Sequence, residues 1–99
     1  MAYQYTARLR IRPGTESTFR TLIDEMVAAE HANPDCLGYE VFHLEDPLDY
    51  VFLETYTDLA ADPAHKNSPV TKPLIERMVA CIDGGFAVEE WFRVASMND

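Results

Sequence analysis

The stretch that decides the fold is Pro34–Ser68, which reads PDCLGYEVFHLEDPLDYVFLETYTDLAADPAHKNS. Two segments of it, Leu37–Leu44 and Tyr50–Thr57, are rich in β-branched and aromatic residues, as β-strands are. Between them, Glu45–Asp49 contains a proline and two aspartates, which favour a turn. The sequence therefore predicts a β-hairpin at the centre of a sheet.

The residues before the hairpin predict a strand and then a helix. Tyr3–Arg12 alternates between apolar or aromatic residues and polar ones, which is the pattern of a strand with one buried face, and Pro13-Gly14 ends it. A helix is expected from Thr15 to about Ala32, ended by Asn33-Pro34. Its apolar residues recur at helical spacing and form one buried stripe: Phe19, Leu22, Ile23, Met26 and Val27.

The residues after the hairpin predict a second helix and a last strand. Asp58 caps a short turn over Leu59–Ala61, and the following Pro63 interrupts regular structure. Ser68 and Pro69 are typical of a helix start, and Gly84-Gly85 of its end. Phe86–Ala95 alternates as a strand does. The predicted buried stripe of the second helix consists of Val70, Leu74, Ile75, Met78, Val79 and Ile82.

The order of these elements is β-α-β-β-α-β, which predicts a ferredoxin-like α+β fold with an antiparallel sheet. The 99 residues fit a single domain over the whole chain, 1–99. Both helices are expected on one face of the sheet. Because neither hairpin strand has a plainly polar side, the other face should also be covered. A homodimer, in which two such faces meet, would cover it.

Composition restricts the partners. The formal net charge of −9 argues against nucleic acid and against anionic membrane surfaces. No apolar run approaches the roughly 20 residues of a membrane span, and no signal peptide is visible. Cys36 and Cys81 lack metal-type spacing and are interpreted as reduced thiols of a cytoplasmic protein. His31, His43 and His65 fall in three different elements, so no metal site is expected.

Two side chains are candidates for catalysis. His65 lies on a proline-flanked segment beside the hairpin, where an imidazole could take a proton from a phenol or hydroquinone. Alternatively, it anchors that segment by bonding a backbone carbonyl. Tyr56 could form an aromatic wall against a planar substrate, or it could simply pack in the core or in a dimer interface. Tyr39, Phe52 and Trp91 carry the same two interpretations.

Two glutamates lie within apolar strands. Glu40 and Glu54 would need partners if buried, and Arg8 and Arg93 stand on strands that would neighbour them. A structural ion pair is one interpretation. A catalytic acid with a raised pKa is the other.

The chain resembles the antibiotic biosynthesis monooxygenase (ABM) family of small dimeric α+β-barrel proteins, and the resemblance covers most of its length. The matching segments occur in the family's order. They are Arg12-Pro13-Gly14, Cys36–Phe42, Asp46-Pro47, Tyr50–Tyr56, Asp58, Ala64-His65 and Asn67-Ser68-Pro69.

The resemblance implies a function. ABM enzymes of known activity oxidise phenolic or anthrone-like compounds with O2, without metal or flavin, in an apolar cavity between helices and sheet. An Asn on the third strand and a Trp four residues later contribute; these positions are Phe52 and Tyr56 here. A haem-degrading branch uses Asn, Trp and His at positions that are Ala7, His65 and Ile75 here, so none matches. Quinol oxygenases form a third group, whose motifs are too loose to compare.

The leading hypothesis is thus a cofactor-independent monooxygenase acting on a small aromatic molecule, as a homodimer. His65 and Tyr56 are its expected catalytic residues. The expected substrate contacts are Tyr39, Phe52, Glu54 and Trp91. The alternative is a small-molecule-binding or isomerase-like dimer, and a purely structural dimer is a third possibility.

Overall fold

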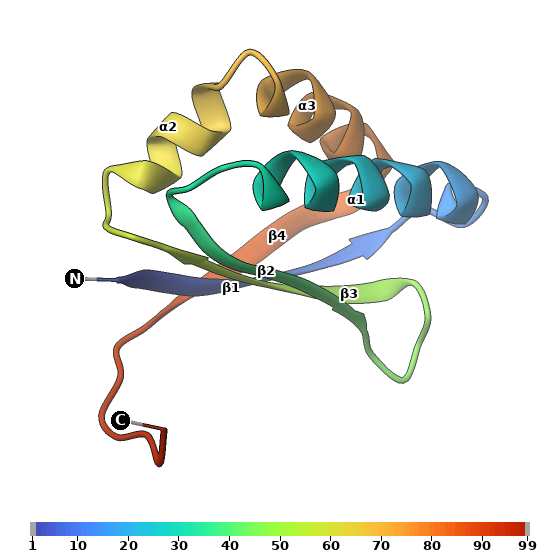
Figure 1. Ribbon diagram of the computed structural model, residues 1–99. Helices are drawn as coiled ribbons and strands as arrows, with labels where there is room; N and C mark the ends of the chain where they lie inside the picture. Colours follow the sequence, from blue (N-terminus) through green and yellow to red (C-terminus); the bar gives the residue numbers. More distant parts are fainter. Residues whose placement is uncertain (1, 99) are drawn as a thin grey trace.

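Four strands form one antiparallel sheet in the order β2-β3-β1-β4, and helices cover one of its faces (Figure 1). The structure, a computed structural model, describes residues 2–98. This arrangement confirms the predicted ferredoxin-like α+β fold. In chain order the elements are β1 (Tyr3–Ile11), α1 (Glu16–His31), β2 (Cys36–His43), β3 (Asp49–Tyr56), α2 (Ala61–Asn67), α3 (Thr71–Cys81) and β4 (Ile82–Trp91).

The core lies between the sheet and α1. Phe19 and Met26 of α1 are fully buried, and the Phe19 ring meets Tyr50 and Phe52 of β3 edge to face. The predicted stripe of α1 is confirmed at its first four positions, but Val27 is 41% exposed. Its place in the buried set is taken by Glu30, a carboxylate with only 3% exposure.

The segment after the hairpin is more regular than predicted. A short helix, α2, replaces the expected turn and irregular stretch, because Pro63 falls in its first turn, where no N–H is needed. The predicted cap at Asp58 is present, since its carboxylate accepts a bond from the N–H of Ala61 at 3.0 Å.

The second half of the chain departs from the prediction at two boundaries. Helix α3 begins at Thr71, so Val70 precedes it and is 63% exposed, and Val79 is 49% exposed. The helix does not run on to Gly84-Gly85. It ends at Cys81, and β4 begins at once because Ile82 pairs with Ile11 of β1. Gly84 then lies inside the strand with a φ of +85°, which glycine adopts without strain.

The face of the sheet opposite the helices is not covered by any segment of residues 2–98 (Figure 1). The register places Phe42, Val51, Leu53 and Arg8 there, together with Trp91, which donates a hydrogen bond to Thr6 at 2.9 Å. The homodimer that would cover this face stays a prediction. No helix within the described residues is long and apolar enough to cross a membrane.

Candidate functional site

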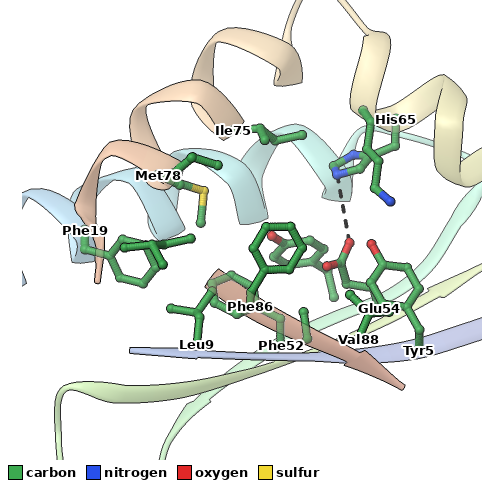
Figure 2. A pocket seen from close by; sticks show the side chains of 15 residues that line it. Tyr5, Leu9, Phe19, Phe52, Glu54, His65, Ile75, Met78, Phe86 and Val88 are labelled. Carbon is green, nitrogen blue, oxygen red and sulfur yellow. Dashed lines mark ion pairs between the residues drawn. The ribbon is translucent and has the colours of Figure 1, made fainter. Parts of the chain in front are cut away.

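A cavity of about 310 Å³ lies between the helices and the sheet. Its walls are mostly apolar and come from both layers (Figure 2). Polar side chains reach it at one end, where His65 of α2 stands above Glu54 and Tyr5 of the sheet (Figure 2). The apolar walls include Leu9, Phe19, Phe52, Ile75, Met78 and Phe86.

Strand register explains why one end is polar. Directly paired residues of an antiparallel sheet point to the same face, so each row of partners lines the cavity together. One row holds Tyr39, Glu54 and Tyr5, and the row beside it begins with Phe52 and Ala7. A polar row therefore lies next to an apolar one. An amphipathic ligand, with a polar group at one end of a ring, fits such a surface.

His65 is held by its ring nitrogen Nδ1. This atom lies 2.5 Å from Oε1 of Glu30, which comes from the last turn of α1. Both side chains are almost fully buried. Because a carboxylate can only accept, Nδ1 carries the hydrogen and Nε2 is left for other partners. The side chain does not bond a backbone carbonyl, so that interpretation of His65 is not supported.

The second ring nitrogen of His65 faces the cavity end. Nε2 lies 3.9 Å from Oε1 of Glu54 (Figure 2). That separation is too long for a direct hydrogen bond. Both groups line the cavity, so a substrate hydroxyl could reach either of them. The site thus presents one nitrogen and one carboxylate to the same ligand.

Glu30 is stabilised as a carboxylate. Burial works against its charge, but the hydrogen bond and charge of His65 outweigh that effect, with further bonds from Cys36 and Asn33. Together they hold the pKa of Glu30 below its ordinary value. The same contact has the opposite effect on its neighbour: burial, and next the bond to Glu30, raise the pKa of the Cys36 thiol to about 12.

The pKa of Glu54 is shifted in the opposite direction from that of Glu30. Burial raises its pKa, and the bond that Tyr56 donates to it at 2.7 Å only partly opposes the rise. The ion pair predicted between an arginine and this glutamate is wrong. Arg8 points to the other face of the sheet, where it lies 3.5 Å from Glu89. The idea of a buried Glu40 is also wrong, because that side chain is exposed on the same open face.

A second polar cluster stands at the cavity rim. The Tyr5 hydroxyl donates to Asp62 at 3.1 Å, and Lys66 lies 2.9 Å from the other oxygen of that carboxylate. Burial is the largest cause that raises the pKa of Tyr5, so its phenol keeps its hydrogen. Lys66 also lines the cavity and brings a positive charge to its edge.

Known proteins resemble this chain in sequence and in fold. A sequence model of the family described as "Antibiotic biosynthesis monooxygenase" matches residues 3–77. This chain belongs to the antibiotic biosynthesis monooxygenase family. The matched region includes every strand and helix from β1 to α2, and with them Glu30, Glu54 and His65.

Individual ABM relatives agree in fold. Rv0793 of Mycobacterium tuberculosis is 32% identical over 63 residues, which span 64% of this chain and 62% of that protein. Its structure superposes with a TM-score of 0.86 at 23% identity and covers 98% of this chain and 99% of that one. A crystal structure described as an antibiotic biosynthesis monooxygenase superposes with a TM-score of 0.87 at 26% sequence identity. The match covers 96% of this chain and 100% of that one.

A more distant ABM structure carries a named activity. A variant of SnoaB from Streptomyces nogalater, described as a cofactor-independent oxygenase, superposes with a TM-score of 0.83. The match covers 99% of this chain and 98% of that one, at 14% identity. At that identity the likeness shows the shared fold.

The predicted site residues of this ABM protein divide into two groups. Tyr39, Phe52, Glu54 and His65 all line the cavity. Tyr56 does not line it, because its side chain is fully buried and its hydroxyl holds Glu54. Trp91 does not line it either, because it lies on the opposite face of the sheet and is 51% exposed.

Sequence reasoning missed Glu30. A signal was present, because position 30 is four residues after Met26 and seven after Ile23, on the apolar stripe of the helix. An acidic side chain in a buried apolar stripe needs a hydrogen-bonding or charged partner. The partner, His65, could be found only from the fold.

Other places in the molecule are weaker candidates. A hollow of about 540 Å³ between α1 and α3 is lined by exposed side chains such as Ser17, Thr18, Glu25 and Arg77. Its one buried ionisable side chain is the Cys81 thiol, which contacts the Arg77 carbonyl at 3.6 Å and has no basic or acidic side chain of the described residues bonded to it. Among residues 2–98, no three His, Cys, Asp or Glu side chains gather in a way that could hold a metal ion.

Proposed function

We propose that this ABM-family protein is a cofactor-independent monooxygenase that oxidises a small phenolic or quinol-type aromatic molecule with O2. The observation that carries the proposal is the arrangement at the polar end of an apolar cavity, where His65 Nε2 and the Glu54 carboxylate face each other across 3.9 Å. The cavity volume of about 310 Å³ is at the lower end of ordinary ligand sites and suits one or two aromatic rings.

The reaction balances without an added reductant. A hydroquinone and O2 give a hydroxyquinone and water: one oxygen atom enters the ring and the other leaves as water. The substrate supplies all four electrons. What the protein must provide is removal of a hydroxyl proton, because the resulting phenolate is the electron-rich form that reacts with O2, and a dry site for the reaction.

The residues present supply the proton removal, and the mostly apolar walls favour exclusion of water once an aromatic ring fills the cavity. His65 Nε2 accepts the substrate proton, and Glu30 stabilises the charged ring from the far side. Glu54 accepts a hydrogen bond from a second substrate hydroxyl, and Tyr56 positions that carboxylate. The rings of Tyr39 and Phe52, themselves edge to face at 6.1 Å, contact the substrate ring.

Oxygen consumption tests the proposal directly. The protein would be mixed with a panel of hydroquinones and anthrones, and O2 uptake and ¹⁸O incorporation from ¹⁸O2 would be measured. We expect uptake with at least one of them, with one labelled atom in the product and one in water. In His65→Gln the rate should fall by about a hundredfold, the usual size of a lost general base.

The matched control is His43→Gln, because His43 is an exposed histidine outside the cavity. It should keep the wild-type rate. If the wild-type protein consumes no O2 beyond the uncatalysed rate with any member of the panel, the monooxygenase proposal is wrong.

A second candidate function is supported by the same pair of groups. A base and a carboxyl group that face each other across the end of the cavity can move a proton between two carbons of a keto–enol system, which is isomerase chemistry and needs no O2. Under anaerobic conditions in D2O, an isomerase would incorporate deuterium at a carbon of a cyclic ketone or diketone probe. A monooxygenase that only removes hydroxyl protons would not.

A further inference from the structure

We propose that the Glu30–His65 pair is a proton relay that connects the substrate cavity with a separate recess on the protein surface. The inference rests on the proposed function for the origin of the proton, which is the substrate hydroxyl. It adds a route by which that proton can leave while a substrate fills the cavity, and it gives Glu30 a role beyond orienting the imidazole.

Two hollows meet at this pair. The recess, of about 150 Å³, lies between the end of α1 and the start of β2, and Glu30 is part of its lining together with Val27, Cys36 and Leu37. His65 belongs to the lining of the cavity and not to that of the recess. Tyr39 lines both, so its side chain is the partition between them.

Among residues 2–98, the side-chain hydrogen bond that crosses this partition is the one from His65 to Glu30. Nδ1 and Oε1 are 2.5 Å apart, a distance over which a proton passes readily. On the cavity side, Nε2 is the ring atom that faces the ligand space. An imidazole accepts a proton at one nitrogen and gives up another from the opposite nitrogen. It can therefore carry charge through the wall without moving.

The atoms balance in both directions. The substrate O–H bond breaks and an Nε2–H bond forms, while the Nδ1–H bond breaks and a proton joins Glu30 and then water in the recess. When the second oxygen atom leaves as water, it needs a proton, and the reverse sequence supplies one. His65 then returns to its starting tautomer, with the hydrogen on Nδ1.

The electrostatics of Glu30 suit a proton acceptor. The bond and charge of His65, with bonds from Cys36 and Asn33, outweigh burial and keep the pKa of this carboxyl low, so Glu30 is the ionised group that can take the Nδ1 proton. The other route from the site would run along Tyr5, Asp62 and Lys66 at the cavity rim. Within the described residues no hydrogen bond joins His65 to that cluster directly, because Glu54 lies between them, 3.9 Å from His65 Nε2 and in contact with Tyr5. Burial raises the pKa of the Tyr5 phenol, which makes it a poor proton carrier.

The test measures exchange of the His65 Nδ1 hydrogen with water, by NMR of the protein with ¹⁵N-labelled histidine and no ligand. In Glu30→Gln the amide oxygen still accepts the hydrogen bond but cannot take the proton. In Val27→Trp the pair is intact and the recess is filled, because Val27 is a half-exposed lining residue. Both variants should slow exchange on the order of tenfold or more.

Val70→Trp is the matched control, since Val70 is exposed and lines none of the hollows described above. It should exchange at the wild-type rate. If Glu30→Gln and Val27→Trp both exchange as fast as the wild type, the proton leaves by the cavity and the relay is wrong.

The outcome separates the relay from the proposed function. If exchange is slower in both variants but the wild-type protein consumes no O2, the relay is supported and the monooxygenase proposal is wrong. If O2 uptake is normal but exchange is unchanged in both variants, the monooxygenase proposal is supported and the relay is wrong. Where both hold, Val27→Trp should also lower the oxidation rate, and small buffer acids should not restore it, because the recess they would enter is filled.

Discussion

Glu54 is an ionisable side chain in a place where charge is costly. Its exposed fraction is 6%, and burial raises its pKa above the ordinary value. The folded chain therefore holds the proton of Glu54 to a higher pH than the unfolded chain does. Stability from this residue is present below the unfolded pKa and is lost as the pH rises through the folded one.

Glu54→Gln should accordingly make the protein more stable at neutral pH. The amide keeps an oxygen that accepts the Tyr56 hydroxyl, and the cost of a buried charge is removed. We expect Tm to rise by a few degrees at pH 8, about 1 kcal/mol for a domain of this size, and to differ little from wild type at pH 4. Calorimetry at several pH values measures this. A variant less stable than wild type at pH 8 would contradict it.

The sequence predicts the residues that line the cavity better than the residues behind them that hold the lining side chains in place. Phe52 and Glu54 could be placed because strand alternation decides which residues share a face. Glu30 could not, because acids on helices are usually solvated and its partner is distant in sequence. Tyr56 was misjudged for a similar reason: alternation puts it on the cavity side, but only packing shows that it is completely covered.

Helix α2 carries His65 and is too short to be stable alone. Its C-terminal end is fixed to α3. The backbone carbonyl of His65 accepts hydrogen bonds from the Thr71 hydroxyl and from the N–H of Ser68. Thr71 is 4% exposed, so water cannot replace its hydroxyl. The position of the imidazole therefore depends on the junction between the two helices.

Thr71→Val should loosen this junction. The side chain keeps its shape and loses its hydroxyl, at a cost of about 1 kcal/mol in the free energy of unfolding. Urea unfolding measures the loss. Thr71→Ser, which keeps the hydroxyl, should stay closer to the wild type. Equal stability of Thr71→Val and wild type would show that the hydroxyl does not support α2.

The elements were predicted better than their boundaries. The hairpin, the first strand and the first helix follow from local patterns and were found. The local pattern predicts an interruption at Pro63, although a proline in a first turn is compatible with a helix. It also predicts a helix end at Gly84-Gly85. The real start of β4 depends on pairing of Ile82 with Ile11, a contact between distant parts of the chain.

The whole molecule leaves much apolar surface uncovered. Phe42 on the open face of the sheet is 49% exposed, and Phe86 and Val88 of β4 are 58% and 48% exposed although they line the cavity. Beyond β4, Phe92 is 78% exposed. Exposure on this scale marks an interaction surface, and we propose a second copy of the chain as its partner.

Light scattering should therefore give a mass near twice 11.3 kDa. Leu53→Asp puts a charge in the middle of the open face and should shift the protein to the monomer. Leu59→Asp is the control, because Leu59 is 63% exposed and lies outside the sheet. It should leave the mass unchanged. A wild-type protein that is monomeric at micromolar concentration would contradict the proposal.

The buried phenols give the protein an optical signal of its own. Tyr5, Tyr39 and Tyr56 are three of the five tyrosines, and burial, followed by the charge of Glu54, raises the pKa of each. Tyrosinate absorbs at longer wavelength than tyrosine, but these rings can ionise only after water reaches them. In alkali, their ultraviolet absorbance should therefore change together with the circular dichroism of the helices, so that this absorbance reports whether the fold around the three rings is still intact.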